Sequence, residues 1–179
     1  MGYTLTIGEA EIDYSEDSCR ITASNVRLDD APAHDEPTDY TNSRWPSYTG
    51  WSESMRALGL TDMMFAGKRG DDDGAGSFEW NGKEYQPLII DHPGAEPVTQ
   101  AHVEYVAAKL RDYKAAHPDH IAQYPPPREG AVPLFGKMYR QEDLSQDPRY
   151  DGNLVRGEWL LFWLRWAVAN CKRPVFVNS

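Results

Sequence analysis

Hydrophobic and polar positions alternate through the first 28 residues, a pattern typical of β-strands with one buried face. Residues 3–7 and 10–14 alternate in this way, and residues 19–26 continue as a returning strand after a polar turn. A long loop is expected at residues 29–46, which contain three prolines, several acids and almost no aliphatic side chains. A loop of this length is usually kept for function or left mobile.

Hydrophobic spacings of three and four residues then predict helices. A short helix is expected where Trp51, Met55 and Leu58 share one side, with Ser47 or Thr49 as its cap.

A longer helix is expected from Thr99 to about His117, before Pro118. The last helix is expected from Asn153, as its cap, to about Cys171. Its hydrophobic residues lie nearly all round, so we expect this helix to be central and buried.

Between these helices, Asn81 and Gly82 join two short alternating stretches and predict a β-hairpin. Residues 87–90 extend beyond it, and a second long loop is expected at residues 118–151. Residues 173–177 are expected to add a closing edge strand.

These elements predict a single α+β domain over residues 1–179. N-terminal antiparallel strands and a middle β-hairpin pack on two or three helices, with a buried C-terminal helix. A length of 179 residues fits one domain. A chain of this size buries about 70% of its unfolded surface, so it needs no metal or disulfide to fold.

The chain carries 28 acidic and 18 basic side chains, a formal charge of -10. Its field repels phosphate, which excludes a general nucleic-acid binder and an anionic-membrane binder but allows a local basic pocket. Acidic clusters at residues 9–17 and 29–39 are consistent with a DNA mimic or virion component. Solubility explains the same charges without a partner.

The N-terminus has no basic leader, and the most apolar stretch, residues 159–169, is shorter than the roughly 20 residues of a membrane span. Cys19 and Cys171 are far apart in the sequence and are expected to be reduced thiols. We therefore expect a cytoplasmic protein, without a membrane partner.

A candidate ligand site lies where the first loop meets the short helix, at Arg44, Trp45, Tyr48 and Trp51. A guanidinium pairs with anions and aromatic faces stack on bases, so a nucleotide or other small anionic ligand would suit this segment. The alternative is that the two tryptophans pin the loop onto the core.

Arg165 interrupts the apolar run of the last helix. An unpaired buried guanidinium is very costly, so Arg165 must meet a carboxylate, reach solvent or line a polar cavity for an anionic ligand.

His92 is a candidate general base, because it follows a strand-like run and its ordinary pKa of about 6.5 lies near neutral pH. Its neighbour Asp91 would point to the opposite face, so a third residue would have to orient it. The alternative is a turn histidine bonded to backbone. We find no motif for a metal, a cofactor or a common hydrolase class, and predict none of these.

Four segments together resemble an uncharacterised family of small proteins encoded by phages and prophages: residues 3–8, 42–51, 92–94 and 163–171. The resemblance implies no activity or site, only the context of an accessory or anti-defence factor in host cytoplasm. We therefore predict a non-enzymatic binding protein for a small anionic ligand, or for a host protein. An enzyme using His92 and an acidic DNA mimic or virion component are the alternatives, and a homo-oligomer stays open.

Overall fold

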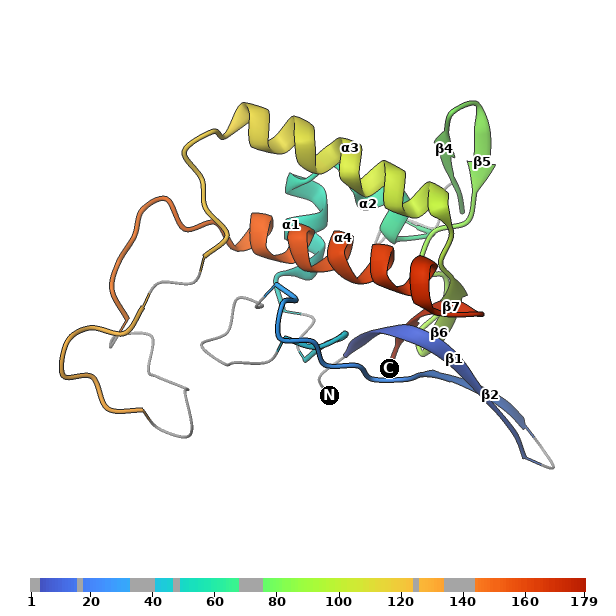
Figure 1. Ribbon diagram of the computed structural model, residues 1–179. Helices are drawn as coiled ribbons and strands as arrows, with labels where there is room; N and C mark the ends of the chain where they lie inside the picture. Colours follow the sequence, from blue (N-terminus) through green and yellow to red (C-terminus); the bar gives the residue numbers. More distant parts are fainter. Residues whose placement is uncertain are drawn as a thin grey trace.

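The computed structural model describes residues 4–15, 18–32, 41–46, 49–67, 76–123, 126–133 and 144–179. Helix α4 (Gly152–Asn170) lies between an antiparallel sheet and helix α3 (Gln100–Ala116), as Figure 1 shows. The short helices α1 (Trp51–Ala57) and α2 (Thr61–Met64) complete the helical side. The predicted α+β class with a C-terminal helix at its centre is confirmed.

The sheet has the strand order β2–β1–β7–β6, and every neighbouring pair is antiparallel. Its strands are β1 (Leu5–Ser15), β2 (Ser18–Ala23), β6 (Gly94–Pro97) and β7 (Pro174–Asn178), and β3 (Arg44–Trp45) pairs with the first residues of β1. Strand β7 therefore lies inside the sheet, and the predicted edge position of residues 173–177 is wrong. Its outer partner β6 was missed because it is short and lies between a glycine and a proline, which are poor strand residues.

The two faces of the sheet are buried in different ways. Leu5, Ile7 and Phe176 are fully buried on the face that packs against α4. Val175 and Val177 alternate with Phe176 and belong to a second, smaller cluster that also contains Ala10. Both faces of the sheet therefore bury side chains, although only one of them packs against the helices.

Strand β1 passes very close to the chain that returns from β2. A Cβ atom on Gly8 would lie 2.2 Å from the backbone oxygen of Ser24, so only glycine fits there. The backbone N–H of Ser24 donates to the carbonyl of Glu9 at 3.0 Å. Beyond this crossing β2 contacts β7 and β6. The β1–β2 hairpin therefore lies over the outer face of the sheet, the face that points away from the helices.

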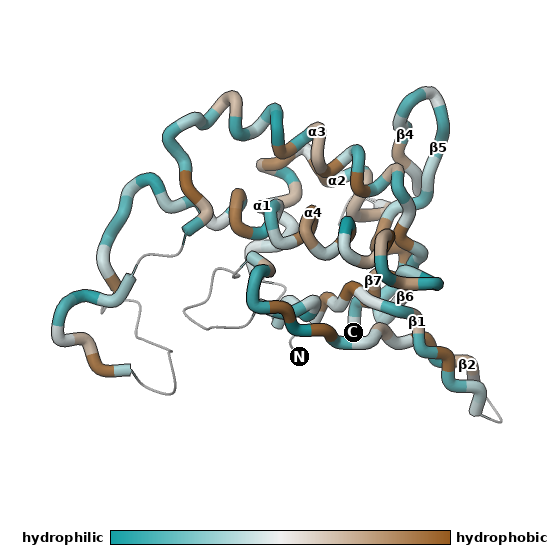
Figure 2. The backbone as a smooth tube through the Cα atoms, in the orientation of Figure 1, coloured by the Kyte–Doolittle hydropathy of each residue, from teal (hydrophilic) through white to brown (hydrophobic). Residues whose placement is uncertain are grey.

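Helix α4 contacts α3, α1, β1 and β7, which explains why its hydrophobic residues lie nearly all round. Gly157 allows the closest approach, since a Cβ atom there would lie 2.6 Å from Leu110 on α3. In Figure 2, α3 alternates between hydrophobic and hydrophilic colours, as expected of a helix with one exposed side. No helix among the described residues is both long enough and apolar enough to cross a membrane.

Helix ends were predicted with mixed success. Thr99 is the N-cap of α3, as expected. The N-cap of α4 is Asp151 rather than Asn153, because the carboxylate accepts the N–H groups of Asn153 and Leu154. Helix α1 begins after Gly50, which has a left-handed φ of 72° and no side-chain cap, so Thr49 is not the cap; Ser47 lies outside the described residues.

The predicted hairpin at Asn81 and Gly82 is confirmed as β4 (Phe78–Trp80) and β5 (Lys83–Tyr85). Both turn residues have positive φ, 51° and 71°, as a two-residue turn of this type requires. Residues 87–90 form only a single bridge, between Ile89 and Phe65.

Candidate functional site

A groove of about 840 Å³ lies between α3, α4 and the segment at residues 28–32. Buried Leu110 and the partly buried Leu161, Phe162 and Trp166 give it an apolar lining. This volume lies in the range of about 300–1,000 Å³ that is usual for small-molecule sites, which combine apolar walls with a few polar groups. We call it the helix groove.

The charged lining of the helix groove is Asp30, Arg111, Lys114, Glu158 and Arg165. Lys114 and Glu158 bind each other, with 2.6 Å between Nζ and Oε1. Arg111 lies 3.5 Å from Asp112 on the same helix, an exposed pair that contributes little. Among the described residues that line the groove, cations therefore exceed anions, although the chain as a whole is strongly acidic.

Arg165 lies exposed on α4 and makes no hydrogen bond or ion pair with any residue that the structure describes. Of the three outcomes expected from the sequence, it reaches solvent while lining a cavity. The guanidinium has five N–H donors, all without an acceptor among the described residues. It is the group in the helix groove best placed to bind an anion.

Arg44 lies in a different place. Its exposed side chain lines a second groove, of about 750 Å³, on the outer face of the sheet. Arg44 and Arg165 were both predicted to bind an anionic ligand, and they line two separate grooves. Tyr48, the third polar member of that predicted set, lies outside the described residues.

Trp45 and Trp51 are core residues, 1% and 0% exposed. With Trp159 they form a packed trio whose ring centroids are 5.2–5.8 Å apart. Neither indole offers a face to a ligand, so the predicted stacking role is corrected in favour of the alternative, in which both tryptophans pin the loop and the short helix onto the core. Aromatic side chains of this size stabilise a core through their large buried area.

His92 is exposed and is oriented by Asn178, whose Oδ1 lies 2.9 Å from its Nδ1. The Asn178 amide donates from Nδ2 to the backbone carbonyl of Asp91 at 2.9 Å, so Oδ1 is left to accept the Nδ1–H of His92. The described residue that bonds to His92 is thus an amide from β7. Its role as a base stays a prediction.

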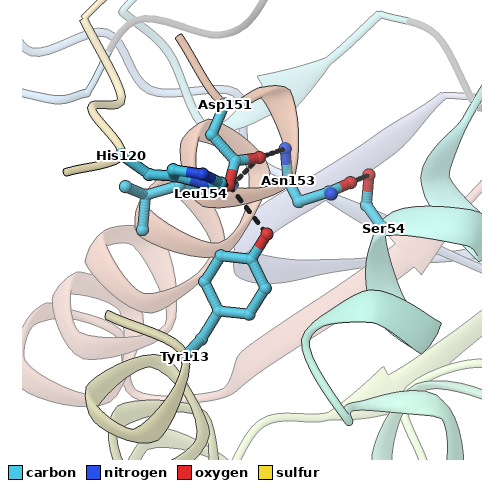
Figure 3. A network of polar contacts seen from close by, with 6 residues as sticks. All are labelled: Ser54, Tyr113, His120, Asp151, Asn153 and Leu154. Carbon is cyan, nitrogen blue, oxygen red and sulfur yellow. Dashed lines mark hydrogen bonds and ion pairs between the residues drawn. The ribbon is translucent and has the colours of Figure 1, made fainter. Parts of the chain in front are cut away.

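A polar network that was not predicted surrounds Asp151, as Figure 3 shows. The Tyr113 hydroxyl and the Nδ1–H of His120 both donate to Oδ2 of Asp151 at 2.7 Å. The N–H of Asn153 donates to Oδ1 at 2.8 Å, and Asn153 in turn accepts the Ser54 hydroxyl at 2.7 Å. The network joins the N-terminus of α4 to α1 and to the end of α3.

Burial raises the pKa of Asp151, but the hydrogen bonds from Tyr113, His120 and the two backbone N–H groups lower it more, so its pKa lies below the ordinary value. Burial first, and then the bond to Asp151, raises the pKa of Tyr113. The carboxylate is therefore held in its charged form by its neighbours.

The bond to Asp151 leaves Nε2 of His120 as an acceptor, an arrangement that can orient a general base. His120 lines neither groove, however, and the ring of His117 stacks on it at 4.7 Å. We therefore assign the network a structural role. Only the position of Asp151 just before a helix could have indicated part of it in the sequence.

No group of three or more metal-ligating side chains occurs in the part of the chain that the structure describes. Comparison with known proteins finds no matching family model, curated protein or solved structure. The helix groove places the guanidinium of Arg165 beside an apolar lining, the combination that small-molecule sites use.

Proposed function

We propose that this protein is a non-enzymatic binding protein that captures a small organic anion in the helix groove. The observation that carries the proposal is the position of Arg165, a guanidinium with no described partner at an apolar groove. In a chain of charge -10, a cation that meets no carboxylate among the described residues is a candidate to bind an anionic ligand.

The lining favours an anion with a flat or aliphatic body. Phe162 and Trp166 are partly buried and can cover an apolar or aromatic group, while Arg165 pairs with the charge. A nucleotide fits this class, because its base stacks on aromatic rings and its phosphate binds guanidinium. Capture of a host protein, catalysis by His92 and DNA mimicry stay predictions.

Replacing Arg165 with glutamine is expected to weaken the binding of 1-anilinonaphthalene-8-sulfonate, an aromatic sulfonate, about tenfold or more. The estimate follows from the roughly 1.5–3 kcal/mol of a hydrogen bond to a charged group. The measurement is a fluorescence titration of wild type and Arg165→Gln at fixed salt. Because Arg165 is exposed, its loss should not disturb the fold.

Arg44→Gln is the matched control, since it removes the same charge from the other groove. Ala107→Trp, which fills the helix groove from α3, should abolish binding. Equal affinity of wild type, Arg165→Gln and Ala107→Trp would refute the proposal.

A further inference from the structure

The groove on the outer face of the sheet, which we call the sheet groove, arises from the path of β2. This strand pairs with the second half of β1 and contacts β7 and β6, leaving a space of about 750 Å³ between them. The small residues Ala23, Gly94 and Ala95 line it and leave the space open.

The charged side chains among the described residues of the sheet groove are both cations, although the chain as a whole is acidic. Arg20 and Arg44 line it, and no described Asp or Glu side chain does. Neither guanidinium forms a hydrogen bond or ion pair within the described ranges. Asp13 is the register partner of Arg20 on β1, but no ion pair within 4.0 Å joins them.

Neutral donors surround the two arginines. Thr6, Thr22 and Asn25 also line the sheet groove, and their hydroxyl and amide groups can donate to an oxyanion. Asn25 accepts a long bond of 3.5 Å from Ser43 through Oδ1, which leaves its NH₂ group for a ligand. The lining thus combines two guanidinium groups with several neutral hydrogen-bond donors.

We propose that the sheet groove binds the phosphate group of a small phosphomonoester. Two guanidinium groups and several neutral donors match an anion with three strong acceptor oxygens better than a carboxylate, which has two. Arg20 from β2 and Arg44 from β3 hold the charge, and Thr22 and Asn25 bind the remaining oxygens. This site is separate from the helix groove and selects a compact polar anion, so it does not depend on the proposed function.

The test uses phenyl phosphate as the probe and benzoate as its carboxylate counterpart, at constant ionic strength. Both are titrated into ¹⁵N-labelled Arg165→Gln protein, so that the helix groove does not compete. Phenyl phosphate is expected to shift the Arg20 and Arg44 Nε–H signals and to bind about tenfold tighter than benzoate.

Adding Arg44→Gln is expected to weaken phenyl phosphate about tenfold, and adding Arg20→Gln as well about a hundredfold, the range expected for charged hydrogen bonds. Glutamine at these exposed strand positions keeps the fold, which the unchanged remainder of the spectrum would verify. Unchanged affinity in the triple variant, or benzoate binding as tightly as phenyl phosphate, would overturn the proposal and leave the helix groove untouched.

Discussion

Replacing Trp51 with alanine is expected to lower the free energy of unfolding by about 3–5 kcal/mol, the usual cost of removing a large buried aromatic side chain. Trp51 is 0% exposed and packs edge-on against Trp159, with 5.8 Å between the ring centroids. The surrounding helices cannot close the cavity, because α4 is already held between α3 and the sheet. Urea unfolding followed by circular dichroism measures the loss.

Trp51→Phe is the matched control. The indole N–H of Trp51 has no hydrogen-bond partner among the described residues, so phenylalanine removes volume without orphaning an acceptor. Trp159→Phe should cost more, since it leaves the backbone carbonyl of Asn42 without the indole N–H that donates to it at 2.9 Å. A folded Trp51→Ala protein with wild-type stability but no ligand binding would instead indicate that Trp51 belongs to a ligand site and not to the core.

The elements predicted correctly are those set by local chemistry. The hairpin at Asn81 and Gly82 needs only two residues with positive φ, and the start of α3 needs only the Thr99 cap. Helix α4 was identified because it is apolar on nearly every side. What sequence could not supply is pairing between distant strands: β7 lies inside the sheet because β6, about 80 residues earlier, pairs with it.

The same difference between local and long-range information explains how much of the candidate site could be predicted from the sequence. Arg165 could be identified because a single cation in an apolar helix must find a polar environment, and the groove provides one. Trp45 and Trp51 could not be assigned, because aromatic side chains line ligand sites and protein cores alike. Arg20 was missed, since nothing in an alternating strand shows that its side chain shares a groove with Arg44, which is 24 positions away.

Replacing Asp151 with alanine is expected to destabilise the protein by about 3 kcal/mol. The loss of the helix cap costs roughly 0.5–2 kcal/mol, and the Tyr113 and His120 donors lose a charged acceptor. Asp151→Asn is the control, because asparagine still caps the helix through Oδ1 but places an NH₂ donor where Oδ2 accepts from Tyr113 and His120. We expect a loss of about 1 kcal/mol from it, measured by urea unfolding at pH 7.

The pH dependence separates the charge of Asp151 from its shape. Its pKa is lower in the folded protein than in the unfolded chain, so the unfolded state takes up the proton first as the pH falls. The stabilisation is therefore complete above the ordinary pKa of about 3.9 and is lost as the pH falls through the folded pKa.

Burial also lowers the pKa of His102, which adds a separate loss that begins below about pH 6.5. Unfolding free energies at pH 7, 5 and 3 should show a larger loss between pH 5 and 3 in wild type than in Asp151→Asn, because the lowered pKa values of Asp147 and Glu9 contribute to that loss in both proteins. Equal losses between pH 5 and 3 in the two proteins would mean that the network does not hold Asp151 as a carboxylate, and that Tyr113 and His120 stabilise α4 without its charge.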